Sequence, residues 1–397
     1  MQIGLLGKTN VGKTTFFSAA TQTTAQMGNY PFTTIDPNVG IVYVRSECAC
    51  KHFGIAHAHE LCVKGTRYIP VKIIDVAGLV PGAHEGKGLG NKFLDDARQA
   101  SALIHVVDAS GSTDMQGQPV PPGTGNPLDD VRFVEDEFDQ WMRQILQREW
   151  QKLSRELESK GGKIIQSITQ RFSGLGIAEY DVEAVLHHLN LLTRKPAEWS
   201  EEDIFLFVKE LRKRTKPIII AANKADLCND LGVLEDLQKV HAAVACSAET
   251  ELLLRKATKS GLIEYLPGAK AFAMKEGVNP STQQKKALDL ACKVMERIGG
   301  TGVQQILDSA CFDLLKLIVV FPVEDESRLS NKDGQVLPDA RLLPSGSTAR
   351  DLARSVHEDL AKGFLHAVDA KTKQRVGAEH QLKNGDVIKI VSSMSRG

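Results

Sequence analysis

A short glycine-containing loop near the start of the chain constrains the fold more than any other feature. Its letters GKTNVGKT run from Gly7 to Thr14 and fit the pattern G-x-x-x-x-G-K-[ST]. An apolar segment, Gln2–Leu6, precedes the loop and predicts a buried strand, and an apolar pattern typical of a helix follows from Val11. In such a turn backbone N–H groups converge on phosphate, and the helix N-terminus adds its positive dipole end. The loop therefore predicts a triphosphate site in an α/β domain.

The residue types in this loop predict separate roles. Lys13 supplies a mobile positive charge to the β- and γ-phosphates, and the Thr14 hydroxyl is a ligand for Mg²⁺. The alternative is a chance match in a glycine-containing turn, which only further motifs in the right order can exclude. The nucleotide-binding residues that we expect in the loop are Gly7, Asn10, Val11, Gly12, Lys13, Thr14 and Thr15.

A second apolar segment, VKIIDVAG, ends in Asp75 and Gly78. A carboxylate at the carboxyl end of a parallel strand can hold Mg²⁺, and a glycine at this spacing frees a backbone N–H to sense a γ-phosphate. Taken alone, D-x-x-G is a weak signal, because many strands end in such a turn. The D-x-x-G motif becomes informative here because it follows the phosphate loop in the chain.

Two later segments complete the order expected of a guanine-nucleotide site. PIIIAANKAD ends in Asn223, Lys224 and Asp226, and VHAAVACSAE ends in Ser247-Ala248-Glu249. The Asp226 carboxylate offers two acceptors to the N1–H and 2-amino donors of guanine, which adenine lacks, and such a site discriminates by about 10⁴–10⁵. A backbone N–H in the last motif would read the 6-oxo group. Ligands of doubly wound sheets bind at this edge.

The composition of the chain limits where the protein can be located and which partners it can bind. The chain has 49 basic and 49 acidic side chains among 397 residues, so a chain-wide surface for polyanions is excluded. No apolar run approaches the roughly 18–20 residues that span a bilayer, and no secretory signal opens the chain. Seven cysteines, an odd number, fit a reducing compartment. We expect a cytoplasmic protein with no membrane partner.

Longer segments resemble a known family. NYPFTTIDPNVG (29–40) and DVAGLVPGAHEGKGLGNKFLDDARQASALIHVVDAS (75–110) resemble translation-factor-class GTPases of the Obg family, near the YchF-like branch and its archaeal relatives. PSGSTARDLARSVHEDLAKGF through GDVIKIV resembles a TGS domain, a small β-grasp module that such GTPases share with some tRNA synthetases. The resemblance implies Mg²⁺-dependent hydrolysis of GTP to GDP and association with the ribosome or RNA.

The resemblance also implies roles for single residues. Thr34 resembles the switch I threonine that completes Mg²⁺ coordination, although spacing does not separate it from Thr33. With Lys13 and Gly78, Thr34 forms the catalytic set that we expect. Asn10 is similar to an asparagine that coordinates K⁺ in related GTPases, and the alternative is a loop residue with left-handed backbone geometry.

Two positions set the expected chemistry apart from that of better-known GTPases. Leu79 stands where Ras-like enzymes carry a water-positioning glutamine, which predicts a slow intrinsic rate. His84, Glu85 and the cation are alternative groups for that role. The YchF branch has a degenerate N-K-x-D element and prefers ATP, whereas this chain keeps Asn223, Lys224 and Asp226, which favours GTP.

The remaining segments divide the chain. A Gly/Pro-rich linker (111–127) precedes a region whose apolar residues recur at three- and four-residue steps, which predicts helices that pack on each other or bind a partner. We expect a first GTPase part at 1–126, a helical insertion at 127–215, a second GTPase part with connecting helices at 216–312 and a TGS-like domain at 313–397.

Two further features leave alternatives open. From Ser327 onward there are 12 basic and 8 acidic side chains, which fits either RNA contact or an ordinary solvated surface. The spacings of a Cys/His cluster match no standard zinc signature, so incidental residues of a surface ribbon are favoured over a Zn²⁺ site. The cluster comprises Cys48, Cys50, His52, His57, His59 and Cys62.

The sequence as a whole predicts an α/β fold. We expect a doubly wound, mostly parallel P-loop GTPase domain, interrupted by a helical insertion and followed by a C-terminal β-grasp domain. The function that follows is GTP hydrolysis as a switch. The alternatives are an ATP-preferring hydrolase of the YchF type and a nucleotide-sensing scaffold that does not hydrolyse. Oligomeric state and physiological partner are not encoded in any motif.

Overall fold

The computed structural model describes residues 1–22, 38–55, 59–76, 96, 98–160, 163–228 and 232–394. They fall into two compact units. The first holds the described residues of Met1–Gln22, Thr33–Ile41 and Lys72–Ile306, and the second those of Val42–Val71 and Leu307–Gly397. Among the described residues, no helix combines the length and the apolar character that a membrane crossing requires. The four-part division made from the sequence remains a prediction.

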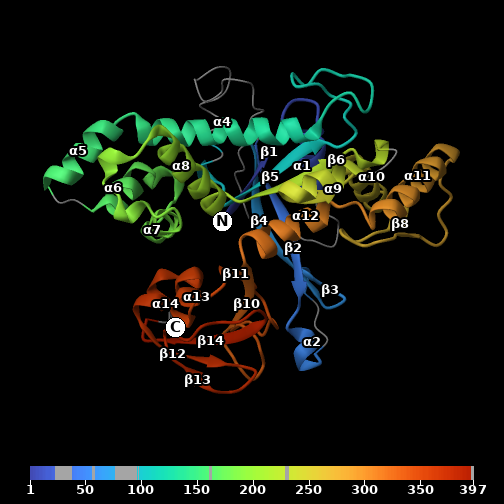
Figure 1. The fold of residues 1–397 in the computed structure, drawn as a ribbon. Coiled ribbons are helices and arrows are strands. Elements are labelled where there is room, and N and C mark those ends of the chain that lie inside the picture. Colours follow the sequence, from blue (N-terminus) through green and yellow to red (C-terminus); the bar gives the residue numbers. More distant parts are fainter. Residues whose placement is uncertain are drawn as a thin grey trace. The chain divides into compact units, whose positions relative to one another are not determined.

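A parallel sheet carries the nucleotide motifs (Figure 1). Its strand order is β2-β4-β1-β5-β6-β7, and β3 pairs antiparallel with β4. The pairs β4–β1, β1–β5, β5–β6 and β6–β7 are parallel. The strands are β1 (Gln2–Leu6), β2 (Val39–Glu47), β3 (Cys62–Val63), β4 (Thr66–Asp75), β5 (Ala102–Asp108), β6 (Ile218–Asn223) and β7 (Ala242–Ala245).

The central strands explain why the sheet was predictable. Every residue of β5 and β6 is buried, as expected for parallel strands covered on both faces. Helix α4 lies against β5, and α1 lies against α10. The helices that belong to this part of the chain are α1 (Lys13–Thr21), α9 (Gly232–Val240), α10 (Ala248–Lys259), α11 (Thr282–Ile298) and α12 (Val303–Ser309). A small hairpin, β8 (Ile263–Glu264) and β9 (Ala273–Met274), lies between α10 and α11.

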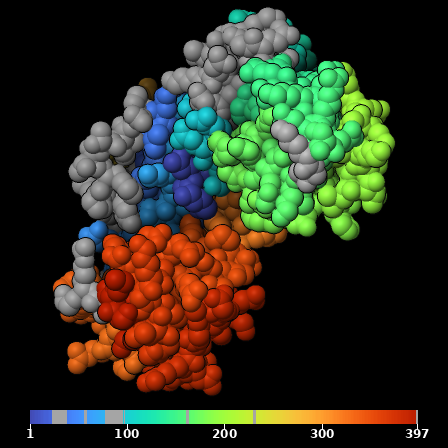
Figure 2. Space-filling model, turned by 90° about the vertical axis from the view of Figure 1, so that its left-hand side faces the viewer, coloured from blue at the N-terminus to red at the C-terminus, as the bar shows by residue number. Residues whose placement is uncertain are grey.

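The predicted helical insertion is present. Its helices are α4 (Pro127–Gln147), α5 (Trp150–Lys160), α6 (Ile164–Arg171), α7 (Glu179–His188) and α8 (Glu201–Thr215). They pack on each other, and in the space-filling view they gather into one rounded lobe, green in Figure 2. Trp150 stacks on Trp199 with ring centroids 4.9 Å apart. Ser200 caps α8 in a capping box with Asp203, as its sequence predicts.

A buried ion cluster joins α4 to α8 within this lobe. Arg212 of α8 is 1% exposed, and its Nε donates to Asp139 Oδ1 of α4 at 2.6 Å. Its Nη2 lies 2.8 Å from Glu135 Oε1, and His241 Nε2 lies 3.1 Å from Glu135 Oε2. Burial would raise the pKa of Glu135, but the hydrogen bond from His241 and the charge of Arg212 outweigh it and lower the pKa to about 2.

The C-terminal module has a sheet of its own. The strand order is β11-β10-β14-β12-β13, with β10 parallel to β14 and the other pairs antiparallel. The apolar segment Leu314–Phe321, whose β-branched residues predict a strand, is extended only from Leu317, because a π-helical turn occupies Ala310–Leu314. The strands are β10 (Leu317–Val323), β11 (Arg341–Pro344), β12 (Phe364–Asp369), β13 (Arg375–Val376) and β14 (Asp386–Ser392), and the helices are α13 (Ala349–Val356) and α14 (Glu358–Lys362).

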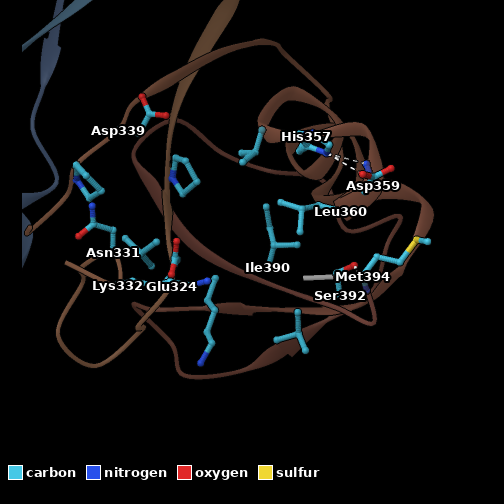
Figure 3. A pocket seen from close by; sticks show the side chains of 16 residues that line it. Glu324, Asn331, Lys332, Asp339, His357, Asp359, Leu360, Ile390, Ser392 and Met394 are labelled. Carbon is cyan, nitrogen blue, oxygen red and sulfur yellow. Dashed lines mark hydrogen bonds and ion pairs between the residues drawn. The ribbon is translucent and has the colours of Figure 1, made fainter. Parts of the chain in front are cut away.

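Helix α13 of this module begins at a capping box, which the hydroxyl of Thr348 and the carboxylate three residues later predict. Thr348 caps α13, and its hydroxyl accepts from the Asp351 N–H while the Asp351 carboxylate accepts from the Thr348 N–H. Apolar side chains of α13 pack on the sheet around Val320 and Ile388. A cavity of about 840 Å³ lies beside β14 and α14, and Figure 3 shows Leu360 and Ile390 among the side chains that line it.

Candidate nucleotide-binding site

The phosphate loop joins β1 to α1, as the sequence predicts. Gly12 precedes α1 and has φ 91°, and a Cβ built on it would lie 2.3 Å from Asn223 Nδ2. Any larger residue would therefore be strained and would collide with Asn223. The amides at the start of α1 are directed toward the loop, which is the arrangement that binds phosphate. Thr14 is exposed there, and Thr15 is half-buried.

Lys13 and Asp75 meet at the carboxyl ends of β1 and β4. Lys13 Nζ donates to Asp75 Oδ1 at 2.6 Å and to the carbonyl of Val76 at 2.6 Å. The two side chains are 14% and 20% exposed, so the pair is open to small ligands from solvent. The first two motifs of the sequence are thereby brought together. The other predicted residues of this part, Thr33, Thr34, Gly78, Leu79, His84 and Glu85, lie outside the described residues.

Asn223 links three of the predicted motifs. Its Nδ2 donates to the carbonyl of Val11 at 2.9 Å, and its Oδ1 accepts from the Ala248 N–H at 3.0 Å. The side chain is 3% exposed. One amide thus connects the phosphate loop, the end of β6 and the start of α10. The sequence assigned Asn223 to nucleotide binding, and the structure adds that it fixes the neighbouring loops.

Lys224 reaches back to the end of β5. It has φ 59°, and its Nζ donates to Asp108 Oδ2 at 2.9 Å and to Ser112 Oγ at 3.2 Å. Burial raises the pKa of Asp108, but hydrogen bonds from Ser110, Lys224 and Ser112 outweigh burial and bring the pKa below its usual value. Asp108 was missed from the sequence. The signal was its position directly after an apolar strand, followed by three hydroxyl residues.

The two motifs that the sequence predicts to read the base lie side by side. Asp226 is half-buried in the short turn Ala225–Leu227, and the Ala225 N–H donates to the carbonyl of Cys246 at 3.1 Å. Ser247 is fully buried and caps α10, with its Oγ accepting from the Thr250 N–H at 3.2 Å. Asn223 engages the Ala248 N–H, so this amide of the Ser247-Ala248-Glu249 motif already has a partner within the protein. Glu249 is exposed in the first turn of α10.

The linker after β5 folds onto the phosphate loop, which no motif predicted. We name residues 111–126 the cover loop. Asn10 has φ 62°, and its Nδ2 donates to the carbonyl of Gly117 at 2.8 Å. Thr9 Oγ1 donates to the carbonyl of Gln116 at 3.3 Å. The left-handed geometry expected of Asn10 as a loop residue is therefore present, and its amide nitrogen is held by the cover loop.

A buried ion pair joins the same loop to the helical insertion. Lys8 is 5% exposed, and its Nζ donates to Asp130 Oδ1 of α4 at 2.7 Å. It also donates to the carbonyls of Asp114 at 2.6 Å and Thr113 at 3.3 Å. Lys8 occupies one of the variable positions of the loop pattern, so the pattern itself gave no signal for this contact.

Comparisons with known proteins agree with this geometry. A family model described as a 50S ribosome-binding GTPase matches residues 2–141, and the TGS domain model matches residues 331–392. A third model, described as the G4 motif-containing domain of YGR210-like Obg-like GTPases, matches residues 221–325. Fold and site together define a P-loop GTP-binding protein.

Relatives that match over nearly the whole length of the chain show which family of GTP-binding proteins it belongs to. An uncharacterized GTP-binding protein of Methanocaldococcus jannaschii is 48% identical and matches over 98% of this chain and 99% of its own. The crystal structure of a GTP binding protein from Pyrococcus horikoshii has a TM-score of 0.79 at 40% identity and covers 99% of this chain and 100% of that one. The ribosome-binding ATPase YchF of Bacillus subtilis is 28% identical over 97% of each chain. The chain belongs to the Obg-like, YchF-related family of GTP-binding proteins.

Proposed function

We propose that this protein hydrolyses GTP to GDP and phosphate and uses the change as a molecular switch. The observation that carries the proposal is the double hydrogen bond of Asn223, which holds the phosphate loop beside the N-K-x-D turn. A triphosphate on the loop and a purine at Asp226 can then be bound by one rigid set of groups. The intact Asp226 carboxylate favours guanine because it finds two donors there.

The residues at the ends of β1 and β4 suit a Mg²⁺ ion. Mg²⁺ takes oxygen ligands, and Asp75 offers a carboxylate that contacts Lys13, while Thr14 offers an exposed hydroxyl. Asp75, Thr14 and Thr34 would hold the ion, which neutralises charge on the β- and γ-phosphates. Lys13 leaves Asp75 when a phosphate competes for its ammonium group. Water attacks the γ-phosphorus in line, and the bond to the β–γ bridging oxygen breaks.

Phosphate loss would change the contacts of the switch residues. Thr34 and Gly78 bind only a triphosphate state in this proposal, so release of phosphate frees both segments. Leu79 cannot orient water, so we propose slow intrinsic turnover that a partner or a monovalent cation accelerates.

Asn10 is the residue through which K⁺ would act. Its Nδ2 is held by the carbonyl of Gly117, which leaves its side-chain oxygen as the atom that can coordinate a cation beside the phosphates. A cation there adds positive charge where negative charge develops. Turnover measured in KCl and in NaCl tests this role, and equal rates would remove it.

Association with the ribosome or RNA is part of the proposal. It is supported by the matching family model, which is described as a 50S ribosome-binding GTPase, and by the name of the Bacillus subtilis relative. The TGS domain and the basic balance of the C-terminal segment are consistent with it. A cytoplasmic location follows from the same proposal.

Nucleotide competition tests the base choice, because the same relative is named an ATPase. We expect GTP to displace a fluorescent nucleotide at concentrations on the order of 10⁴-fold lower than ATP. Equal competition would support the ATP-preferring alternative. Turnover no faster than spontaneous hydrolysis, with and without ribosomes, would support a scaffold that senses nucleotide.

The variant Asp226→Asn sharpens this test. An asparagine side chain can accept a hydrogen bond from N1–H of a purine and donate one to a 2-oxo group. The variant should therefore bind GTP more weakly and xanthosine triphosphate more tightly than the wild type does. Wild-type protein should show the opposite order. If the variant binds GTP as the wild type does, Asp226 does not face the base and the proposed specificity is wrong.

A further inference from the structure

Three cysteines converge at the end of β2, in the unit that also contains the C-terminal module. We name Cys48, Cys50 and Cys62 the cysteine triad. Their sulfur atoms all lie within 4.8 Å of one another, and the Cys50 and Cys62 Sγ atoms are 3.9 Å apart. Cys48 and Cys50 are buried, and Cys62 is half-buried. The cluster is therefore more than a set of incidental surface residues.

The sulfur spacing distinguishes a shared metal from a disulfide. Two thiolates bound to one tetrahedral Zn²⁺ at about 2.3 Å lie roughly 3.8 Å from each other. A disulfide requires about 2.05 Å between the sulfur atoms. The observed 3.9 Å between the Cys50 and Cys62 sulfur atoms excludes a disulfide. It suits two ligands of one metal ion, and in the metal-free protein it also suits a hydrogen bond between the two thiols.

Backbone hydrogen bonds hold the triad in place. Cys48 follows β2, Cys50 begins the short helix α2 (Cys50–Phe53), and Cys62 belongs to β3. The Cys48 N–H donates to the carbonyl of Gly65 at 3.0 Å, and Gly65 has φ 77° in the turn between β3 and β4. The Cys62 N–H donates to the carbonyl of His59 at 2.9 Å. The ligand set is thus preorganised by the backbone itself.

A buried arginine lies beside the triad. Arg67 is paired with Cys62 across the β3–β4 hairpin and is 2% exposed. Its Nη2 donates to the carbonyl of Pro338 at 3.0 Å, while Nε and Nη1 have no hydrogen-bond partner among the residues that the structure describes. Asp339, a carboxylate whose charge acts on Arg67, is paired with Arg341 at 2.6 Å. A buried guanidinium with unpartnered N–H groups is destabilising unless a negative group nearby compensates its charge.

The balance of charge around Arg67 indicates which negative group compensates its guanidinium. Three thiolates around one divalent ion carry a net charge of −1, which the Arg67 guanidinium neutralises. With three neutral thiols, the guanidinium would have only Asp339 as a counter-charge within the described part of the chain, and Asp339 is already paired with Arg341. Thiolates are soft ligands and select Zn²⁺ over Mg²⁺ or Ca²⁺.

The neighbouring histidines are not needed as ligands. His59 Nδ1 accepts from the Leu61 N–H at 3.0 Å, and His59 Nε2 lies 3.0 Å from the carbonyl of Pro338, so both ring nitrogens are engaged. His52 is exposed, and His57 lies outside the described residues. We propose that Cys48, Cys50 and Cys62 bind one Zn²⁺, with Arg67 as its buried counter-charge and a solvent molecule in the fourth position.

The test uses the full-length protein and has a spectroscopic readout. Protein purified without added metal should contain one Zn²⁺ per chain by elemental analysis. After chelation, Co²⁺ should give thiolate-to-cobalt charge-transfer absorption and the ligand-field bands of a tetrahedral site. Cys50→Ser and Cys62→Ser should each lose the bands, whereas Cys292→Ser, which changes an exposed cysteine of α11, should keep them. A circular dichroism spectrum and a cooperative unfolding transition like those of the wild type show that each variant is folded.

Arg67→Met tests the counter-charge separately, because it keeps all three thiols. Loss of a group that supports a metal site lowers affinity by about 10–100-fold, and we expect a loss of that size with the Co²⁺ spectrum retained at saturation. Folded wild-type protein with no zinc and no Co²⁺ bands would overturn the proposal. A Cys50–Cys62 disulfide found by mass spectrometry under reducing cytosol-like conditions would overturn it as well.

Discussion

At the scale of single residues, the cover loop depends on one glycine. Gly117 has φ 77°, and a Cβ built on it would lie 2.0 Å from Thr9 Oγ1. Its carbonyl accepts from Asn10, so a shift of Gly117 moves a residue of the phosphate loop. We expect Gly117→Ala to weaken GTP binding by roughly tenfold, equivalent to about 1.4 kcal/mol, as measured by titration calorimetry.

A second glycine of the same loop provides the control for that variant. Gly123 has φ 84°, but no atom lies within 4 Å of the position that a Cβ would take there. Gly123→Ala therefore introduces the same kind of backbone strain without the collision. Equal effects of the two substitutions would mean that strain alone, and not contact with Thr9, controls the phosphate loop.

At the scale of secondary-structure elements, Arg212 holds α8 against α4. Arg212→Met would leave the buried carboxylate of Asp139 without its cation and half-buried Glu135 with His241 alone among the described residues. Losing one partner of a buried pair costs about 3–5 kcal/mol. All three tryptophans lie in the helical insertion, so tryptophan fluorescence during urea unfolding reports on this region. We expect the fluorescence midpoint to fall markedly, and Lys213→Ala, at an exposed neighbouring position, to leave it almost unchanged.

The same cluster predicts how the insertion responds to acid. The pKa of Glu135 is about 2 in the folded protein, below its ordinary value of 4.5. The stabilisation is therefore complete above pH 4.5 and is lost as the pH falls toward 2. Between these limits the unfolded chain binds the extra proton, so stability should rise with pH. Glu135→Gln should flatten this part of the profile, again followed by tryptophan fluorescence, and an unchanged slope would contradict the assignment.

At the scale of the whole molecule, the proposed RNA contact should depend on salt. Arg375 and Lys383 are exposed in the C-terminal module. If both contact phosphates, Arg375→Glu with Lys383→Glu should reduce the slope of log affinity against log salt by about 2 in ribosome co-sedimentation. Lys152→Glu with Arg155→Glu reverses two exposed charges in α5 and should have no such effect. Equal losses in the two double variants would indicate a general charge effect.

The sequence predicted those parts of the molecule that local physics determines. Short stretches of sequence are enough to predict three of them, because the spacing of apolar residues and the positions of glycines and hydroxyl residues are local signals. They are the strand Gln2–Leu6, the phosphate loop and the capped helix after Ser200. Asp108 and Lys8 were missed because their roles come from partners about 100 residues away, at Lys224 and Asp130. The cysteine triad matched no spacing rule, since its three residues are brought together by the β3–β4 hairpin and the end of β2. A local sequence pattern does not show which residues from different elements are close in space.

The ion pair between Lys8 and Asp130 bears on how this architecture can be altered. Excising the helical insertion would remove the counterion of a lysine that is 5% exposed within the phosphate loop, and losing one partner of a buried pair costs about 3–5 kcal/mol. A chimera that grafts this GTPase core onto another insertion must therefore supply a carboxylate at the graft, or replace the lysine at the same time.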